Sequence, residues 1–338
     1  MKISIRSQQS DIKYDITIRR DSLDDVSDYF DLNRKVLVVT DDGTPSCYSE
    51  KVMSQSRRPY LYSIEAGEPS KNIDNFSRIL AFMLEKKFTR SDAVVAVGGG
   101  VVGDLAGFVA SAYMRGVAFY NAPTTLLSQV DSSIGGKCAV DFGGVKNSIG
   151  AFKFPSAVLI DPNTLRTLDR RQVSAGLAEA IKMGLTSDAS LFGLIEKSEK
   201  LDDDIDHIIA KSLRVKADVV SSDPFEAGLR KVLNFGHTVG HAIESLYGGS
   251  LLHGECVAAG MTYMCSDEVL KRLVPVLDKY GLPHSVGFDR DKALDLIGSD
   301  KKASGDSISV VYVDRIGSFE FRSMKVEELG RAIAVGDS

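Results

Sequence analysis

The chain has 338 residues, which is more than one ordinary hydrophobic core organises and about right for two domains. Its hydrophobic fraction of 43% and charged fraction of 26% are typical of a globular protein. The formal net charge of −5 provides no basic field, so a nucleic-acid partner is not expected. Any anionic ligand must therefore be held by a few local cations.

The cysteines and the N-terminal sequence bear on the cellular compartment expected for the protein. Cys47, Cys138, Cys256 and Cys265 form no Cys-x-x-Cys pair and suggest no disulfide framework in a chain of this length. The sequence has neither a basic-then-apolar signal pattern at its start nor a run of about 18 apolar residues. We therefore expect reduced thiols, no membrane partner and a cytoplasmic location.

The first half of the chain predicts alternating strands and helices. Residues 2–5 and 14–18 alternate polar and apolar side chains, as in an antiparallel hairpin at the edge of a larger sheet. Residues 73–84 have the apolar spacing of an amphipathic helix. Continuous apolar runs predict buried strands at 35–40, 93–97 and 157–160. This alternation is typical of an α/β domain.

A glycine turn follows the strand predicted at 93–97 and opens a helix that runs to Ala112. Gly98, Gly100 and Gly103 match G-x-G-x-x-G, a pattern that lets the backbone approach a pyrophosphate at a helix N-terminus. The turn does not follow the first strand, and no acid lies about 20 residues downstream for a ribose hydroxyl. Asp41, at the end of an earlier strand, could take that role. The alternative is a tight turn that needs glycine only for its backbone angles.

Polar residues gather in two segments that the sequence predicts to be loops. The first covers residues 128–137, after Thr124 and Thr125 end a strand, and the second contains Lys146 and Asn147. Within them Asp131 and the lysines Lys137 and Lys146 could converge on a phosphate or a developing oxyanion. The alternative for either lysine alone is a solvated surface side chain.

After residue 162 the chain changes character, so we place a domain boundary there. Strand patterns are confined to 308–313 and 319–321, and helices are predicted at 172–185, 201–221, 225–246, 255–272 and 289–298. In the first of these helices, Glu179 and Lys182 lie three apart among small and apolar neighbours. An exposed ion pair is the simple alternative, but we favour an inward acid that could complete a metal site.

Three of the five histidines lie close together in the sequence. Asp223 is a good N-cap, so His237 and His241 should be four apart on one face of the following helix, with His253 twelve residues beyond. That spacing suits two imidazoles on one divalent cation, although a helix packing contact is an alternative. Gly236 and Gly240 cost about 1 kcal/mol each in a helix, which requires close approach of another element or a ligand.

Five motifs in order give the chain a family resemblance. They occupy residues 98–104, 123–137, 176–182, 229–241 and 252–255, and the similarity extends from about Asp41 to about Lys302. The chain resembles the 3-dehydroquinate synthases within the sugar-phosphate cyclases. The resemblance implies a homodimer whose Rossmann-like NAD-binding α/β domain covers residues 1–162. It implies a mostly helical metal- and substrate-binding domain at 163–338, with the active site in the cleft between the two.

The resemblance also assigns residues. It places the divalent metal, Zn²⁺ or Co²⁺, on Glu179, His237 and His253, which leaves His241 beside the substrate. It places NAD on Asp41, Glu68, Lys71, Gly100, Val101, Val102, Gly103, Asp104, Thr124, Thr125, Lys137, Lys146, Thr164, Leu165, Arg166 and Thr167. It places the substrate on Asp131, Lys137, Asn147, Lys182, Lys216, Arg230, Asn234 and one of Lys301 or Lys302. Arg115 resembles the arginine that reaches the partner's phosphate site.

The implied reaction converts 3-deoxy-D-arabino-heptulosonate 7-phosphate into 3-dehydroquinate and phosphate, a step of the shikimate pathway leading to chorismate and aromatic amino acids. NAD⁺ oxidises a ring hydroxyl, phosphate is eliminated, the hydride returns, and the opened ring closes by an aldol addition. One departure is Asp223-Pro224-Phe225-Glu226, where many members have Asp-Glu-Arg-Glu. The alternatives are a related cyclase, a metal-dependent alcohol dehydrogenase that releases NADH, and a non-catalytic relic that would have lost a ligand.

Overall fold

The computed structural model describes residues 1–6, 12–299 and 307–335, so Lys301 and Lys302 lie outside the described residues. The chain divides into two compact units. Unit 1 contains Met1–Leu168 and Lys216–Phe225, and unit 2 contains Asp169–Val215 and Glu226–Ser338. The domain boundary expected after residue 162 remains a prediction. None of the described helices is long and apolar enough to cross a membrane.

Unit 1 is built on a seven-stranded sheet of order β1-β2-β9-β6-β5-β3-β4. The strands β1 and β2 pair antiparallel at one edge, as predicted, and the remaining pairs are parallel. The strand bounds are Lys2–Arg6 (β1), Lys13–Ile18 (β2), Lys35–Asp41 (β3), Arg58–Ile64 (β4), Ala93–Gly98 (β5), Ala118–Pro123 (β6) and Ala157–Ile160 (β9). The parallel sheet confirms the α/β prediction.

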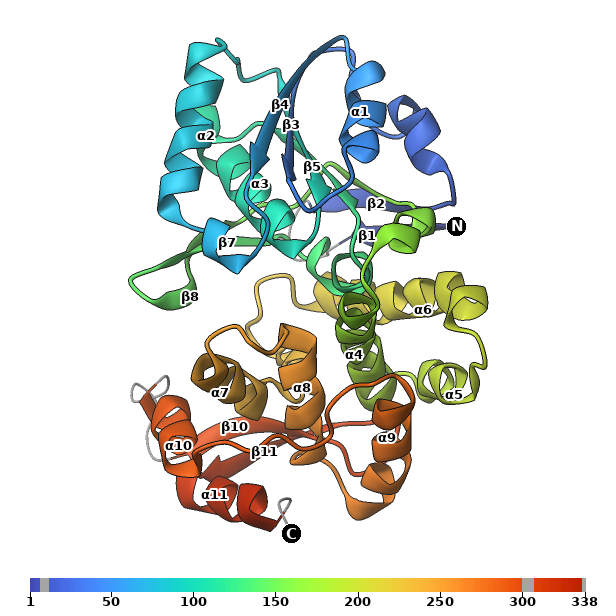
Figure 1. Cartoon of the computed structure of the whole chain (residues 1–338), viewed down its shortest axis with the longest axis vertical. Helices are drawn as coiled ribbons and strands as arrows, with labels where there is room; N and C mark the ends of the chain where they lie inside the picture. Colours follow the sequence, from blue (N-terminus) through green and yellow to red (C-terminus); the bar gives the residue numbers. More distant parts are fainter. Residues whose placement is uncertain (7–11, 300–306, 336–338) are drawn as a thin grey trace. The chain divides into compact units, whose positions relative to one another are not determined.

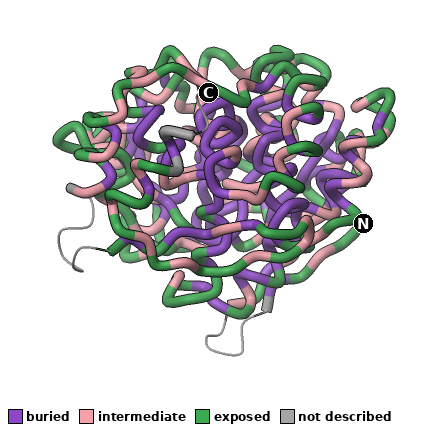
Figure 2. The backbone as a smooth tube through the Cα atoms, turned by 90° about the horizontal axis from the view of Figure 1, so that it is seen from below, coloured by how far each residue is buried: buried purple, intermediate pink, exposed green. Residues whose placement is uncertain are grey.

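Both faces of this sheet are buried, which explains the continuous apolar strands. Along β3, Val36 and Val38 join one hydrophobic cluster while Leu37 and Val39 join the other. The first cluster is completed by α1 (Ser46–Ser54), and the second by α2 (Ile73–Glu85) and α3 (Gly100–Ala112). Figure 1 shows these helices beside the strands of the sheet, and Figure 2 shows the backbone coloured by burial, with buried stretches inside and exposed stretches on the outside.

Two segments of unit 1 that were predicted as loops have regular structure. Lys137–Phe142 (β7) and Val145–Phe152 (β8) form an antiparallel hairpin, and Ser128–Ser132 forms one turn of π-helix. Lys146 and Asn147 therefore lie in a strand. The prediction was wrong because most of β8 is exposed, so its side chains show no buried face from which a strand could be recognised.

Unit 2 is mostly helical, as predicted. Its helices are α4 (Arg170–Thr186), α5 (Ala189–Lys197), most of α6 (Leu201–Ser222), α7 (His237–Tyr247), α8 (His253–Thr262), α9 (Asp267–Lys279), α10 (Arg290–Ser299) and α11 (Val326–Val335). Its described strands are β10 (Ser307–Tyr312) and β11 (Glu320–Lys325), which pair antiparallel.

Two helix predictions in unit 2 were wrong in their bounds. The helix expected at 225–246 is instead a 3₁₀ segment, Leu229–Asn234, followed by α7, because Gly236 has a left-handed φ of 77° and starts a new helix. The helix expected at 255–272 breaks between α8 and α9. There, the Ser266 N–H donates to Val313 O at 3.0 Å and the Ser266 side chain caps α9, and no local pattern predicts such a long-range pairing.

Candidate functional site

Three helices of unit 2 bring the predicted metal ligands together. Glu179 lies in the middle of α4, while His237 and His253 are the first residues of α7 and α8. Glu179 Oε1 is 3.7 Å from His237 Nε2 and 3.6 Å from His253 Nε2. Three ligand atoms therefore surround one point, as a divalent cation with an open coordination position requires.

His241 also belongs to this cluster, one turn after His237. Its ring centroid is 5.1 Å from that of His237 and 5.7 Å from that of His253. One nitrogen from each of the three rings lies within 4.8 Å of the others. The pair suggested by the spacing, His237 and His241, and the set implied by the resemblance, Glu179, His237 and His253, therefore all lie in this one cluster.

The buried carboxylate of Glu179 has the environment expected of a cation ligand. Glu179 is 0% exposed, and among the described residues its Oε1 has no hydrogen-bond partner. Burial opposes its ionisation, but its ion pair with buried Lys182 holds the pKa of Glu179 well below its usual range. Burial, together with Lys182, lowers the pKa of His237 well below its usual range, so that ring is neutral, as a metal ligand must be.

Glycines allow the three helices to approach closely enough to form this cluster. A Cβ on Gly254 would lie 1.9 Å from Ala175 O of α4. A Cβ on Gly240 would lie 2.9 Å from Cys256 O of α8, and one on Gly236 would lie 2.8 Å from Val257 O. The close approach inferred from Gly236 and Gly240 is confirmed, and the approaching element is α8.

An ion pair fixes the start of α8 to α4. Arg171 Nε donates to Glu255 Oε1 at 2.6 Å, and Arg171 Nη2 donates to Ser250 O at 3.0 Å. Glu255 Oε2 in turn accepts the Leu252 backbone N–H at 2.8 Å, which satisfies a free donor at the helix start. His253 lies between Leu252 and Glu255, so these contacts also fix its position.

The predicted NAD residues lie in unit 1 around the glycine turn. The turn joins β5 to α3, and Thr124 N donates to Gly98 O at 2.9 Å. Buried Lys71 is 2.5 Å from Glu68 Oε1 and 3.7 Å from Asp104 Oδ2. Burial raises the pKa of Asp104 to about 7, although Lys71 opposes this shift. Three of the predicted residues therefore form one charged group at the start of α3.

The remaining NAD residues of unit 1 have structural partners of their own. Asp41 Oδ1 accepts the Thr44 N–H at 2.8 Å at the end of β3. The Thr164 carbonyl and the Thr167 hydroxyl both contact the Tyr48 hydroxyl, at 3.4 and 2.9 Å. Lys137 begins β7, Lys146 lies in β8, and the segment from Thr164 to Thr167 belongs to one 3₁₀ turn.

The predicted substrate residues are divided between the units. In unit 1, Lys216 Nζ lies 2.6 Å from Asp131 Oδ1, and the backbone N–H of Asn147 donates to Asp141 Oδ1 at 2.8 Å. In unit 2, Lys182 and Arg230 are buried, and Asn234 Nδ2 donates to Glu226 Oε1 at 3.0 Å. Arg115 is exposed in a short 3₁₀ segment of unit 1, Tyr113–Arg115.

Two glutamates that contact predicted site residues were not assigned from the sequence. Glu226 accepts from Asn234 and has a positive φ of 62°, which is uncommon for a residue with a side chain. Glu244 Oε2 lies 3.1 Å from His253 Nδ1. The sequence does contain a pattern that points to Glu244: it follows His241 by three residues and so shares a face of α7 with it.

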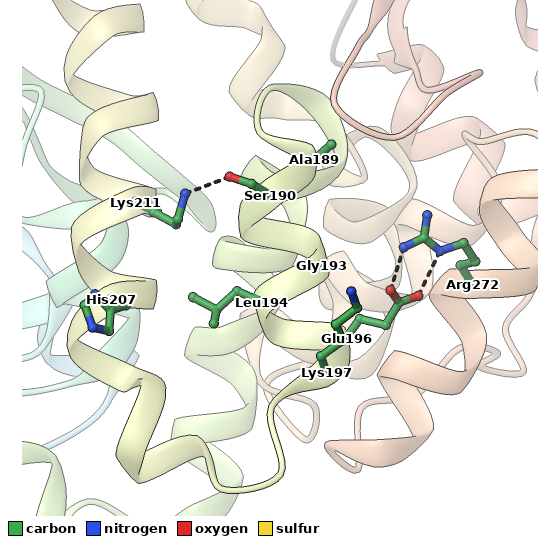
Figure 3. Close-up of a pocket in the computed structure, with 9 residues that line it drawn as sticks. All are labelled: Ala189, Ser190, Gly193, Leu194, Glu196, Lys197, His207, Lys211 and Arg272. Carbon is green, nitrogen blue, oxygen red and sulfur yellow. Dashed lines mark hydrogen bonds and ion pairs between the residues drawn. The ribbon is translucent and has the colours of Figure 1, made fainter.

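A separate pocket of about 640 Å³ in unit 2 contains none of these residues. It lies along α5, α6 and α9, and Figure 3 shows the contacts of Lys211 with Ser190 and of Arg272 with Glu196 beside it. None of the predicted site residues therefore lines this pocket.

Comparisons with known proteins agree with the resemblance. The family model for the 3-dehydroquinate synthase N-terminal domain matches residues 61–175, and that for the C-terminal domain matches residues 176–303. A 3-dehydroquinate synthase from Streptococcus agalactiae serotype V (strain ATCC BAA-611 / 2603 V/R) is 42% identical over 313 residues, which cover 87% of this chain and 88% of that protein.

Solved structures share the fold over nearly the whole chain. The 2-epi-5-epi-valiolone synthase from Streptomyces hygroscopicus subsp. jinggangensis 5008, with NAD⁺ and Zn²⁺ bound, is 26% identical with a TM-score of 0.89, covering 97% of this chain and 98% of that one. A 2-deoxy-scyllo-inosose synthase complexed with carbaglucose-6-phosphate, NAD⁺ and Co²⁺ is 23% identical with a TM-score of 0.87, covering 98% and 99%. With both family models matched in order and a close relative along most of its length, the chain belongs to the 3-dehydroquinate synthase family.

Proposed function

We infer that this protein converts 3-deoxy-D-arabino-heptulosonate 7-phosphate into 3-dehydroquinate and phosphate. The observation that carries this inference is the match of both family models in sequence order, together with a relative of that name at 42% identity. It is a phosphate-eliminating cyclase of the shikimate pathway, and its cofactors are NAD and a divalent metal, as in its structural neighbours.

The metal ligands that we propose are Glu179, His237 and His253. Glu179 supports this choice because its Oε1 is within 3.7 Å of both other ligand nitrogens and a buried carboxylate is most stable beside positive charge. Bound to this site the metal would polarise a substrate hydroxyl as a Lewis acid, while NAD⁺ would accept a hydride and later return it. His241 is then available to hydrogen-bond the substrate or to transfer a proton.

Buried cations are the residues that we propose for binding the phosphorylated, carboxylated substrate. Arg230 is 3% exposed and Lys216 is 5% exposed, so neither is an ordinary solvated surface charge. A cation held away from water interacts more strongly with an anion than an exposed one does. Lys182 would do the same beside the metal ligands, and the ion pair with Asp131 would hold Lys216 in one orientation.

For the cofactor, we propose that α3 and its glycine turn receive the NAD pyrophosphate. The free backbone N–H groups at the start of a helix attract anions, and Gly98 to Gly100 allow close approach. Glu68, Lys71 and Asp104 form the charged group beside that turn. The cytoplasmic location and the homodimer with Arg115 at the partner's site are also proposals.

Redox stoichiometry tests the proposed function. With substrate in large excess over a trace of NAD⁺, phosphate release should greatly exceed the amount of cofactor, because the hydride is returned in each turnover. Absorbance in the NADH band should not rise in step. Stoichiometric NADH would indicate an alcohol dehydrogenase, and no phosphate at all would indicate a non-catalytic relic. An E179A variant is the control, and it should release no phosphate above background.

A further inference from the structure

Glu244 is a buried acid beside the proposed metal ligands. It lies on the inner face of α7 and is 9% exposed. Its Oε2 is 3.1 Å from Nδ1 of His253, across the turn that joins α7 to α8. The comparisons assign it no role, and its partner is the ring that begins α8.

The contact determines which nitrogen of His253 faces the proposed metal. A carboxylate only accepts hydrogen bonds, so Nδ1 of the His253 ring carries a proton and donates it to Glu244. Nε2 is then the nitrogen left for a metal, and it lies 3.6 Å from Glu179 Oε1. His237 has the same arrangement, because its Nδ1 is 3.0 Å from Phe235 O while its Nε2 is 3.7 Å from Glu179 Oε1. Both rings are therefore held with Nε2 towards one point.

We propose that Glu244 is a positioning residue for the metal site. Its carboxylate holds the His253 ring in one orientation and one tautomer, and its negative charge makes Nε2 a better electron donor. A backbone carbonyl does the first of these tasks for His237, but only a carboxylate adds the charge. The proposal rests on the proposed function, in which His253 is a ligand.

A merely structural role is the alternative. Glu244 and His253 join α7 to the first residue of α8, and this contact could stabilise the helix pair without affecting the metal. The two roles differ in what they change. A structural role lowers the stability of the apo-protein and leaves the metal affinity of the folded protein unaltered, whereas a positioning role lowers that affinity in a protein that remains folded.

The test compares E244Q and E244A with wild type and with E196Q. Glu196 is the matched control, because it is a paired glutamate of unit 2 that contacts Arg272 at 2.8 Å, away from the histidines. Zn²⁺ affinity is measured by titrating the apo-protein against a competing chelator, and the thermal midpoint of the same apo-protein is recorded. The visible absorption of the Co²⁺-loaded protein reports the ligand geometry.

We expect E244A to bind Zn²⁺ about 10- to 100-fold more weakly than wild type, as for other residues behind a metal ligand. E244Q should lose less, because its amide oxygen can still accept from Nδ1 but carries no charge. Both variants should alter the Co²⁺ absorption, whereas E196Q should change neither the Zn²⁺ affinity nor the Co²⁺ absorption. E244Q preserves the shape of the side chain, so it decides the question if E244A does not fold.

Wild-type Zn²⁺ affinity in E244Q, with or without a loss of stability, would overturn the proposal. H253A separates this failure from failure of the proposed site. If H253A loses Zn²⁺ and E244Q retains it, His253 is a ligand and only the role of Glu244 is wrong. If H253A retains full Zn²⁺ affinity, the ligand assignment itself is wrong, and the proposal for Glu244 falls with it.

Discussion

The closest helix contact in the proposed metal site makes Gly254→Ala an informative substitution. The added Cβ would lie 1.9 Å from Ala175 O and 2.5 Å from Ala175 C. Backbone atoms cannot rotate away, so reaching an ordinary separation of about 3.4 Å requires α8 to move from α4 by roughly 1.5 Å. His253 precedes Gly254 and would move with it, away from Glu179 on α4.

Such a movement is large for a metal site, whose ligands must be held to within about 0.5 Å. We expect G254A to weaken Zn²⁺ binding at least tenfold. We also expect overpacking to reduce the free energy of unfolding of the apo-protein by about 1–3 kcal/mol. Chelator competition measures the first effect, and denaturant unfolding of metal-free protein measures the second.

The matched control is Gly193→Ala in α5, where an added Cβ would meet nothing within 4 Å. That variant should bind Zn²⁺ as wild type does and should be more stable by up to about 1 kcal/mol, since alanine favours helix more than glycine does. If G254A bound Zn²⁺ with wild-type affinity and unfolded at the same denaturant concentration, the close approach of α4 and α8 could not be what holds the ligands together.

Three further predictions concern the proposed metal ligands, Asp104 and Arg115. Alanine at any one of the three proposed ligands should remove most of the metal found by elemental analysis, whereas H241A should keep the metal and lose turnover. Loss of metal in H241A would instead favour the pair His237 and His241, four residues apart, as ligands. Because burial raises the pKa of Asp104 to about 7, above the value of about 3.9 for an unfolded aspartate, the folded apo-protein binds the proton more tightly, and its stability should fall as the pH rises from about 4 to about 7. D104N should flatten that slope in unfolding measurements, and an unchanged slope would rule out Asp104 as its source. Mixing R115A with H237A should restore activity after subunit exchange if Arg115 serves the partner's site, since one site then has both residues intact; no recovery would place Arg115 in its own subunit's site or in none.

Local patterns were enough to predict much of the fold. The strands β3, β5 and β9 are short apolar runs buried on both faces, and such runs can be recognised without any knowledge of their neighbours. The unusual glycines beside His237 and His241 indicated a close approach that the structure confirms. The small and apolar neighbours of Glu179 already favoured it as an inward acid, but the family resemblance was needed to choose His253 over His241, because spacing alone favoured His237 with His241.

Features that depend on distant partners were not predictable in this way. The strand β8 is mostly exposed, and the break before α9 depends on the pairing of Ser266 with Val313. The contact between Glu244 and His253 depends on how α7 and α8 pack. In the last two cases the interaction joins residues that come together only when the chain folds, so the sequence near either residue does not predict it.

Unit 1 is built from two separate segments of the chain, and this limits the order in which its parts can fold during synthesis. Residues 1–168 supply the whole parallel sheet, yet the lysine that pairs with Asp131 at 2.6 Å is Lys216. Phe225, whose ring centroid lies 5.2 Å from that of Phe152, is also synthesised late. The first unit therefore cannot be completed during translation until α4 and α5, which belong to the second, have already been made. A gene fragment ending at residue 168 would lack Lys216 and Phe225, so unit 1 cannot be obtained by cutting the gene at one point.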